Sequence, residues 1–212
     1  MKIEWLGYCC LLITSGENTI LIDPYDGSIG LPVVRKKARV VVSTVPHPWH
    51  NNASAAGSDA IVIDHSGEYE TGGVFFTLLP IMNGHGLVIK DKPASVLKIQ
   101  AEGINLVYTG ALKMPLPPAI EDELGNVDIL LLPVGGGELT NAEQATKLMR
   151  EIEPRAVVPL AYAQSDLKPK LGTVASFLAE AGLKTGAPEE FWRVAKKDLP
   201  ADTTIVKILS AE

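Results

Sequence analysis

The sequence predicts a single α/β domain over residues 1–212, built mainly from strands. Three observations support this fold class. Each half of the chain opens with short strand-like runs separated by turn residues, and each half closes with strand–helix–strand segments. No Pro-, Gly- or Ser-rich linker divides the two halves. The composition, 46% hydrophobic and 21% charged, is that of a globular protein with enough residues to bury a substantial core.

In the first half, apolar and β-branched runs bounded by turn residues predict strands. These runs are Lys2–Leu6, Cys10–Thr14, Thr19–Asp23, Arg39–Ser43, Ala60–Asp64 and Gly73–Met82. The glycines and prolines after Asp23 predict a surface loop over residues 25–37, and residues 66–72 read as a turn. Asn52–Ala56 predicts a short helix that ends at Gly57.

In the second half, the sequence predicts further strands at Val96–Gln100, Ile104–Thr109, Asp128–Val134, Ala156–Ala161, Phe191–Val194 and Thr203–Leu209. Helical spacing predicts a short acidic helix at Ile120–Leu124, a helix with apolar positions from 142 to 152, and a third from 174 to 181. A capping box of Thr140 and Glu143 would start the second of these helices. The glycine run at 135–137 lacks the lysine and hydroxyl of a phosphate-binding loop, so it predicts a tight turn.

The stretch from Thr44 to Asn52 is the strongest candidate for a functional site. It follows the buried Arg39–Ser43 run, and its two prolines prevent the strand from continuing. His47 and His50 therefore lie on a loop at the carboxyl end of a strand, where α/β sheets form ligand sites. Asp23 ends a neighbouring strand and is a candidate general base, although a role as an acceptor of backbone N–H groups suits its position better.

Bulk properties exclude several classes of function. A net charge of −6 disfavours a general nucleic-acid binder, and Arg35-Lys36-Lys37, the longest basic run, reads as a solvated loop. No run is apolar enough for a membrane span, and no signal peptide is recognisable. Cys9 and Cys10 are adjacent in a strand-like run and point to opposite faces, so they predict no disulfide and suit a cytoplasmic location.

Four motifs, in order along the chain, resemble those of the metallo-β-lactamase superfamily. They are Trp5-Leu6-Gly7-Tyr8-Cys9-Cys10, Ile20-Leu21-Ile22-Asp23-Pro24, Gly67-Glu68-Tyr69-Glu70, and the long run from Val127 to Gly136. The chain is most similar to the small metal-dependent hydrolases related to L-ascorbate-6-phosphate lactonase. The resemblance implies a four-layer αββα sandwich of two mixed sheets with outer helices, and a site at one edge between the sheets.

The same resemblance implies that the metal site is degenerate. The family's His-x-His-x-Asp-His motif falls on residues 45–50, where His47 and His50 match. Of the seven ligand positions only these two are kept. Non-matching residues occupy the others, namely Val45, Trp49, Asn83, Ala111 and Ala161, and Tyr8 replaces the histidine of the opening motif. In the family layout His47 and His50 serve different metals, whereas a catalytic zinc needs about three protein ligands.

Alternative interpretations remain for these residues. His47 and His50 could bind one metal with His85, Cys10, Tyr8 or Asp23 as further ligands, or could be neutral imidazoles hydrogen-bonded to backbone or to Asp23. Cys10 with His47 could also form a nucleophile–base pair. His65 reads as a surface residue. Trp49 either fills the vacated metal space, buried against Ala111 or Ala161, or lines a pocket for a ligand.

The sequence therefore predicts a protein of metallo-β-lactamase-like fold that has lost most of its metal ligands, holds no cofactor, and serves a binding, regulatory or assembly role rather than catalysis. The expected partner is a small molecule or a protein, and self-association stays open. The alternative is a hydrolase of a small anionic ester, lactone or phosphoester with a reorganised mononuclear Zn site at His47 and His50, with His85 as a further ligand.

Overall fold

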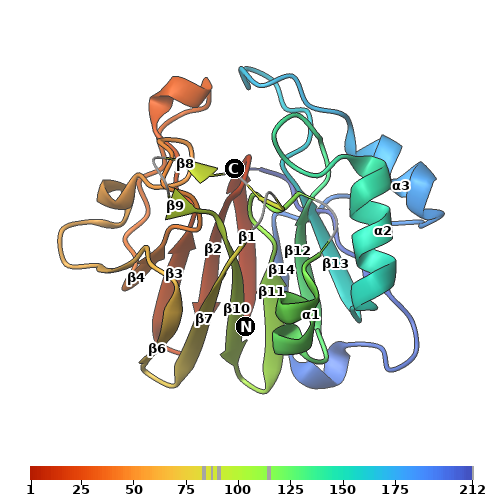
Figure 1. Ribbon diagram of the computed structural model, residues 1–212, viewed down its shortest axis with the longest axis horizontal. Coiled ribbons are helices and arrows are strands. Elements are labelled where there is room, and N and C mark those ends of the chain that lie inside the picture. The colour runs from red at the N-terminus through yellow and green to blue at the C-terminus, as the bar shows by residue number, and fades with distance from the viewer. Residues whose placement is uncertain (83–84, 87, 90–91, 114–115, 212) are drawn as a thin grey trace.

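Two mixed β-sheets form the centre of the molecule (Figure 1). The computed structural model describes residues 1–82, 85–86, 88–89, 92–113 and 116–211. The first sheet has the order β14-β1-β2-β3-β4-β5, in which β3, β4 and β5 run parallel and the other neighbours antiparallel. Its strands are β1 (Lys2–Gly7), β2 (Cys10–Ser15), β3 (Asn18–Ile22), β4 (Val40–Val42), β5 (Ile61–Ile63) and β14 (Phe191–Arg193).

The second sheet has the order β15-β13-β12-β11-β10-β7-β6. Strands β11, β12, β13 and β15 run parallel, and the β6–β7–β10–β11 part is antiparallel. Its strands are β6 (Gly67–Thr71), β7 (Val74–Pro80), β10 (Ser95–Ala101), β11 (Ile104–Tyr108), β12 (Ile129–Pro133), β13 (Ala156–Leu160) and β15 (Ile205–Val206). A separate small ribbon pairs β8 (Val88–Ile89) with β9 (Lys92–Pro93).

The core lies between the two sheets and under the helices. Buried apolar side chains from both sheets form one continuous cluster, to which β1 contributes Ile3 and Trp5, and β7 contributes Phe76 and Leu78. Strands β4, β12 and β13 are buried along their whole length. Such strands are covered on both faces, which explains why their sequences are continuous apolar runs rather than alternating ones.

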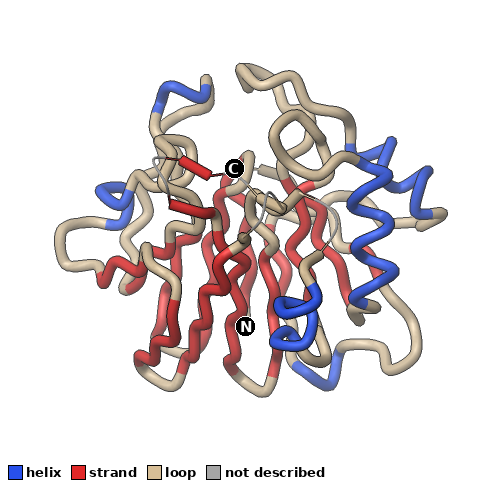
Figure 2. Tube along the Cα trace, in the orientation of Figure 1, coloured by secondary structure: helices blue, strands red, loops and turns tan. Residues whose placement is uncertain are grey.

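The outer layers are unequal (Figure 2). Helices α1 (Pro118–Leu124), α2 (Ala142–Ile152) and α3 (Val174–Ala181) lie on the side of β12 and β13, and α2 packs against α3 and β12. On the side of β4, the described residues form only the single-turn 3₁₀ helices η1 (Gly27–Ile29) and η2 (Ala53–Ala56). A third such turn, η3 (Lys196–Asp198), follows β14. None of the described helices is long and apolar enough to cross a membrane.

The four-layer sandwich and nearly all predicted elements are confirmed, with three local corrections. Residues 66–72 contain the edge strand β6 rather than only a turn, because Glu68-Tyr69-Glu70 pairs along β7. The capping box of α2 is shifted by one residue: Asn141 caps the helix and Gln144 closes the box. The loop over 25–37 is not purely a surface loop, since Ile29 and Leu31 are buried and η1 lies within it.

Candidate functional site

Three strand ends meet at the candidate site with unusual backbone conformations. Tyr8, Asp23 and Ala161 have φ angles of 46°, 44° and 47°, in the left-handed region that L-residues with a side chain rarely adopt. Tyr8 follows β1 of the first sheet and Ala161 follows β13 of the second. The Ala161 N–H donates to the Tyr8 carbonyl at 3.0 Å, so the two sheets are joined at this edge. Such conformations persist only where surrounding contacts hold them in place.

Asp23 is the centre of the hydrogen-bond network beneath the His loop. Its carboxylate is fully buried and accepts four hydrogen bonds. The donors are the Thr44 N–H and hydroxyl, both at 2.7 Å, the Tyr108 hydroxyl at 2.7 Å, and Nδ1 of His50 at 2.9 Å. The predicted role of Asp23 as an acceptor of a backbone N–H is thus confirmed, and the same carboxylate also accepts from two hydroxyl groups and an imidazole.

Both retained histidines are held through Nδ1. His50 is buried and its Nδ1 lies on Asp23, the arrangement by which a carboxylate fixes the ring of a metal-binding histidine. The Nδ1 atom of His47 accepts the Trp49 N–H at 3.2 Å. The predicted contacts with backbone and with Asp23 are therefore confirmed. Desolvation, followed by the neighbouring His50, lowers the pKa of His47, so its imidazole is neutral at pH 7.

The spacing of the two rings does not suit one tetrahedral metal. The ring centroids of His47 and His50 are 6.4 Å apart. Two imidazoles on one tetrahedral zinc, with Zn–N bonds of about 2 Å, would place their centroids about 5 Å apart. A shared tetrahedral ion would therefore require the two rings to move closer together than they lie here.

The other positions of the family site carry no ligands. Val45, Ala111 and Ala161 are buried apolar residues, 1%, 0% and 0% exposed. Within the described ranges, no group of three or more His, Cys, Asp and Glu side chains is placed to hold a metal ion. Since a catalytic zinc needs about three protein donors, the residues that the structure describes do not fit the metal centre of the fold.

Two predicted positions lie in or beside the segment of residues 83–91. Asn83 lies outside the described residues. His85 is half-buried, and its backbone N–H donates to Met82 while its carbonyl accepts from Lys113. His85 does not form a metal-binding group with the described His, Cys, Asp and Glu side chains. His65 is exposed beside Asp64, as predicted for a surface residue.

The cysteines are not activated nucleophiles. Both are free and buried. Burial and the nearby Asp23 raise the pKa of the Cys10 thiol well above its usual range, and the same two causes raise that of Cys9. A thiol without thiolate character is a poor nucleophile, which argues against Cys10 as a partner of His47. Burial likewise raises the pKa of Tyr8, so its phenol stays protonated.

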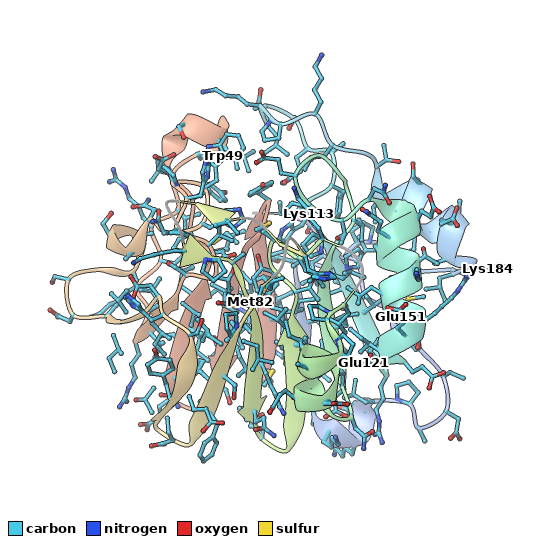
Figure 3. All side chains as sticks on the ribbon, viewed as in Figure 1. Trp49, Met82, Lys113, Glu121, Glu151 and Lys184 are labelled. Carbon is cyan, nitrogen blue, oxygen red and sulfur yellow. The ribbon has the colours of Figure 1, made fainter. Side chains whose placement is uncertain are left out.

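Trp49 is partly buried and packs against the hydrophobic core, and its described contacts are with His47, Tyr8 and Ser28. It lies near the upper edge of the molecule (Figure 3). The indole packs edge-on against the rings of His47, with centroids 5.0 Å apart, and Tyr8, at 6.1 Å. Its Nε1–H donates to the hydroxyl of Ser28 at 2.9 Å. The polar N–H thus has its hydrogen-bond partner on η1, while the ring packs against the aromatic residues of the site.

Next to the rings of Trp49, His47 and Tyr8, the loop after β3, which contains η1, meets the loop after β13 of the other sheet. The Ile29 carbonyl accepts the Lys168 N–H at 2.9 Å, and the Ser28 carbonyl accepts Nζ of Lys168 at 2.6 Å. Gly30 is required at the crossing, because a Cβ there would lie 2.2 Å from the Asp166 carbonyl oxygen. Below them, the side-chain oxygen of Gln164 accepts the Tyr8 N–H at 2.8 Å.

Sequence reasoning missed Tyr108 and Gln164, which complete this network, and it included Thr44 only as the first residue of the His stretch without predicting its contact with Asp23. Tyr108 is 85 positions from Asp23, and Gln164 is 156 positions from Tyr8. No local pattern marks such contacts. The one usable signal is positional: Thr44 and Tyr108 each lie at the carboxyl end of a predicted strand, where ligand sites gather.

Replacing Trp49 with alanine is expected to lower the free energy of unfolding by about 1–2 kcal/mol. The substitution removes two aromatic contacts and one hydrogen bond of a side chain that is only partly buried, so the cost is lower than for a fully buried aromatic residue. Trp192→Ala, at a 6% exposed residue of β14, should cost about 3–5 kcal/mol. Urea melts of both variants test this; equal losses would show that Trp49 is a core residue in solution.

Comparisons with known proteins relate this chain to a protein family. A family model described as a beta-lactamase superfamily domain matches residues 2–161. The chain is 25% identical over 190 residues to a UPF0173 metal-dependent hydrolase of Methanoregula boonei, covering 76% of this chain and 82% of the relative. It is also 24% identical, over an alignment of 241 positions, to a UPF0173 metal-dependent hydrolase of Archaeoglobus fulgidus. That alignment covers 98% of this chain and 96% of the relative.

A similar solved structure is a protein of Thermotoga maritima, assigned to the Zn-dependent hydrolases of the metallo-β-lactamase superfamily. It superposes with a TM-score of 0.78 at 25% identity, over 99% of both chains. The motifs, the two mixed sheets and the family model, which spans most of the sequence, agree. The chain belongs to the β-lactamase superfamily, with the metallo-β-lactamase fold.

Proposed function

We propose that this protein is a non-catalytic member of its superfamily, which uses the retained fold for binding or regulation. One observation carries the proposal. The two remaining family histidines are fixed by separate hydrogen bonds, with ring centroids 6.4 Å apart, and the described residues offer no third ligand. Without converging donors, no metal ion is held to acidify a water or polarise a carbonyl or phosphoryl group.

The replacement residues support the same conclusion by their chemistry. In a metal site, several carboxylates and imidazoles are held together by the charge of the ion. Removing the ion alone would leave like charges crowded in a poorly solvated place, at a cost of several kcal/mol. Here Trp49 and Ala111 replace both acids, and Val45 and Ala161 replace two histidines. The site therefore suits a stable protein without metal.

The second candidate function is a hydrolase of a small anionic ester, lactone or phosphoester at a reorganised site. Two observations favour it: the relatives named metal-dependent hydrolases, and the Asp23–His50 hydrogen bond, which is the support that a metal-binding histidine uses. For this hydrolase function, His47 and His50 would have to move closer to each other, and a further ligand such as His85 would have to join them.

Elemental analysis of the untagged, purified protein separates the two functions. We expect far less than one equivalent of Zn, Mn or Fe per chain. With these metals added, hydrolysis of p-nitrophenyl acetate, dihydrocoumarin and bis(p-nitrophenyl) phosphate should be no faster than with the His47→Ala/His50→Ala variant. About one bound ion per chain that is lost in this variant, together with metal-dependent hydrolysis, would establish the hydrolase instead.

A rebuilt site provides the positive control. A five-fold variant would restore the metal ligands at the positions that the family resemblance assigns to them. Its substitutions are Val45→His, Trp49→Asp, Asn83→His, Ala111→Asp and Ala161→His. We expect it to bind zinc in titration calorimetry, whereas the parent does not. If the variant folds by circular dichroism yet binds no zinc, the assignment of these positions to the family site is wrong.

A further inference from the structure

A large cavity lies on the thinly covered side of the first sheet, where Asn52, the last residue of the His stretch, is among its lining residues. It has a volume of about 1040 Å³, comparable to sites for drug-sized ligands. Residues at the amino ends of β3, β4 and β5 line it, namely Thr19, Arg39 and Ala60, and η2 and the segment 33–39 complete it. The His loop leaves the opposite, carboxyl end of β4.

The walls of this cavity are fixed by backbone hydrogen bonds. The N–H groups of Lys36 and Ala38 donate to the carbonyls of Ala55 and Ala56 on η2, at 3.0 and 3.2 Å. The Arg39 N–H donates to the Thr19 carbonyl at 2.9 Å, at the start of β3. The segment therefore lies extended between η2 and the sheet, and the cavity is a feature of the folded chain.

The alternation of an extended segment sorts the side chains of residues 34–39 by chemistry. Val34 and Ala38 are buried, and with Ala55 and Ala56 of η2 they give the cavity an apolar lining. The alternate residues Arg35, Lys37 and Arg39 are exposed and also line it. Residues two apart on an extended chain project to the same side, so these three cations gather at one place.

Within the described part of the chain, Arg35, Lys37 and Arg39 form no ion pair with an acidic side chain. Asp59 is the one acidic residue lining the cavity, and the hydroxyl of Ser58 donates to it. The cavity therefore combines local positive charge with apolar surface, although the whole chain has a net charge of −6. Such a surface favours the binding of an anion that has an apolar body.

We propose that this cavity binds an anionic amphiphile: a small molecule with a carboxylate, phosphate or sulfate head group on an apolar chain or ring system. Arg35, Lys37 and Arg39 hold the head group, and Val33, Val34, Ala38 and Ala55 contact the apolar body. Arginine and lysine are the residues that bind such head groups, arginine through paired N–H donors. Arg35 and Lys37 of the basic run are exposed, as the sequence predicted for a solvated loop, and in this proposal they also hold the head group.

The test uses 8-anilinonaphthalene-1-sulfonate with the folded, full-length chain. We expect saturable binding of about one probe per chain by fluorescence, weakened by added salt because the head-group contacts are ionic. N-phenyl-1-naphthylamine, which has the apolar rings without the sulfonate, should bind at least about tenfold more weakly. Equal binding of the two probes, or no binding of the sulfonate, would overturn the proposal.

Charge-matched variants locate the site. Arg35→Gln/Lys37→Gln/Arg39→Gln should weaken the sulfonate at least about tenfold. The control Lys170→Gln/Lys184→Gln/Lys197→Gln removes the same charge from exposed residues outside the cavity and should leave binding unchanged. Equal weakening in both would mean that only the net charge of the protein matters.

A pair of substitutions at Val33, 47% exposed on the cavity wall, separates charge from apolar contact. Val33→Asp should abolish binding of the sulfonate, whereas Val33→Lys should keep or strengthen it. Equal loss in both variants would show a purely apolar patch and would overturn the assignment of an anionic ligand. Neither result depends on the state of the His47–His50 site.

Discussion

Replacing Asp23 with alanine is expected to lower the free energy of unfolding by about 4 kcal/mol, a large effect for a single substitution. The carboxylate is fully buried, and its removal leaves buried donors of Thr44, Tyr108 and His50 without an acceptor. Each unsatisfied buried donor costs roughly 1–3 kcal/mol, partly recovered where water enters the space. The left-handed backbone at this residue, with φ of 44°, adds strain that aspartate tolerates better than alanine.

Asp23→Asn is the matched control. Asparagine also tolerates the left-handed conformation and keeps one carbonyl oxygen as an acceptor, so we expect a loss of about 2 kcal/mol. Urea denaturation followed by circular dichroism measures both variants. If Asp23→Ala costs less than Asp23→Asn, the carboxylate is not the centre of a satisfied network, and a catalytic or metal-binding role for Asp23 would regain support.

The sequence predicts the secondary structure well wherever local patterns decide it. Clear local patterns mark the continuous apolar runs of β4, β12 and β13 and the helical spacing of apolar residues in α2 and α3. These patterns are clear because burial acts on each element as a whole. The secondary-structure predictions that failed concern segments whose local pattern is weak. Strand β6 lies at a sheet edge and consists of mostly polar, exposed or partly exposed residues, so its pattern resembles that of a turn.

The site could be predicted in its residues but not in its geometry. Asp23, His47 and His50 are identifiable from their positions after strands. The orientation of Trp49 is not, because it depends on Ser28, 21 residues away, and on rings brought together only by the fold. The same holds for the cavity at residues 33–39, whose apolar wall comes from η2.

Gly135 of the three-glycine run is needed for close packing beside the site rather than for binding a phosphate. A Cβ at this position would lie 2.2 Å from the carbonyl oxygen of Ala161, 2.8 Å from Cβ of Leu171 and 3.1 Å from Cα of Tyr162. Two of these three atoms belong to the backbone that follows β13, which cannot move without breaking the Ala161–Tyr8 hydrogen bond between the sheets. Only glycine lets the two chain segments approach this closely.

Gly135→Ala is therefore expected to lower the free energy of unfolding by about 3 kcal/mol or more, the upper range for overpacking a buried place. Gly137→Ala, in the same run, meets only Leu171 at 3.4 Å, so its cost of about 1 kcal/mol comes from its φ of 71°. Gly186→Ala meets nothing within 4 Å and has no left-handed backbone, so it should be neutral within about 0.5 kcal/mol. Urea melts of the three variants should give this order; a Gly135→Ala loss no greater than that of Gly137→Ala would mean that the β13 end can yield, and that the Ala161–Tyr8 junction is not the rigid part of the site.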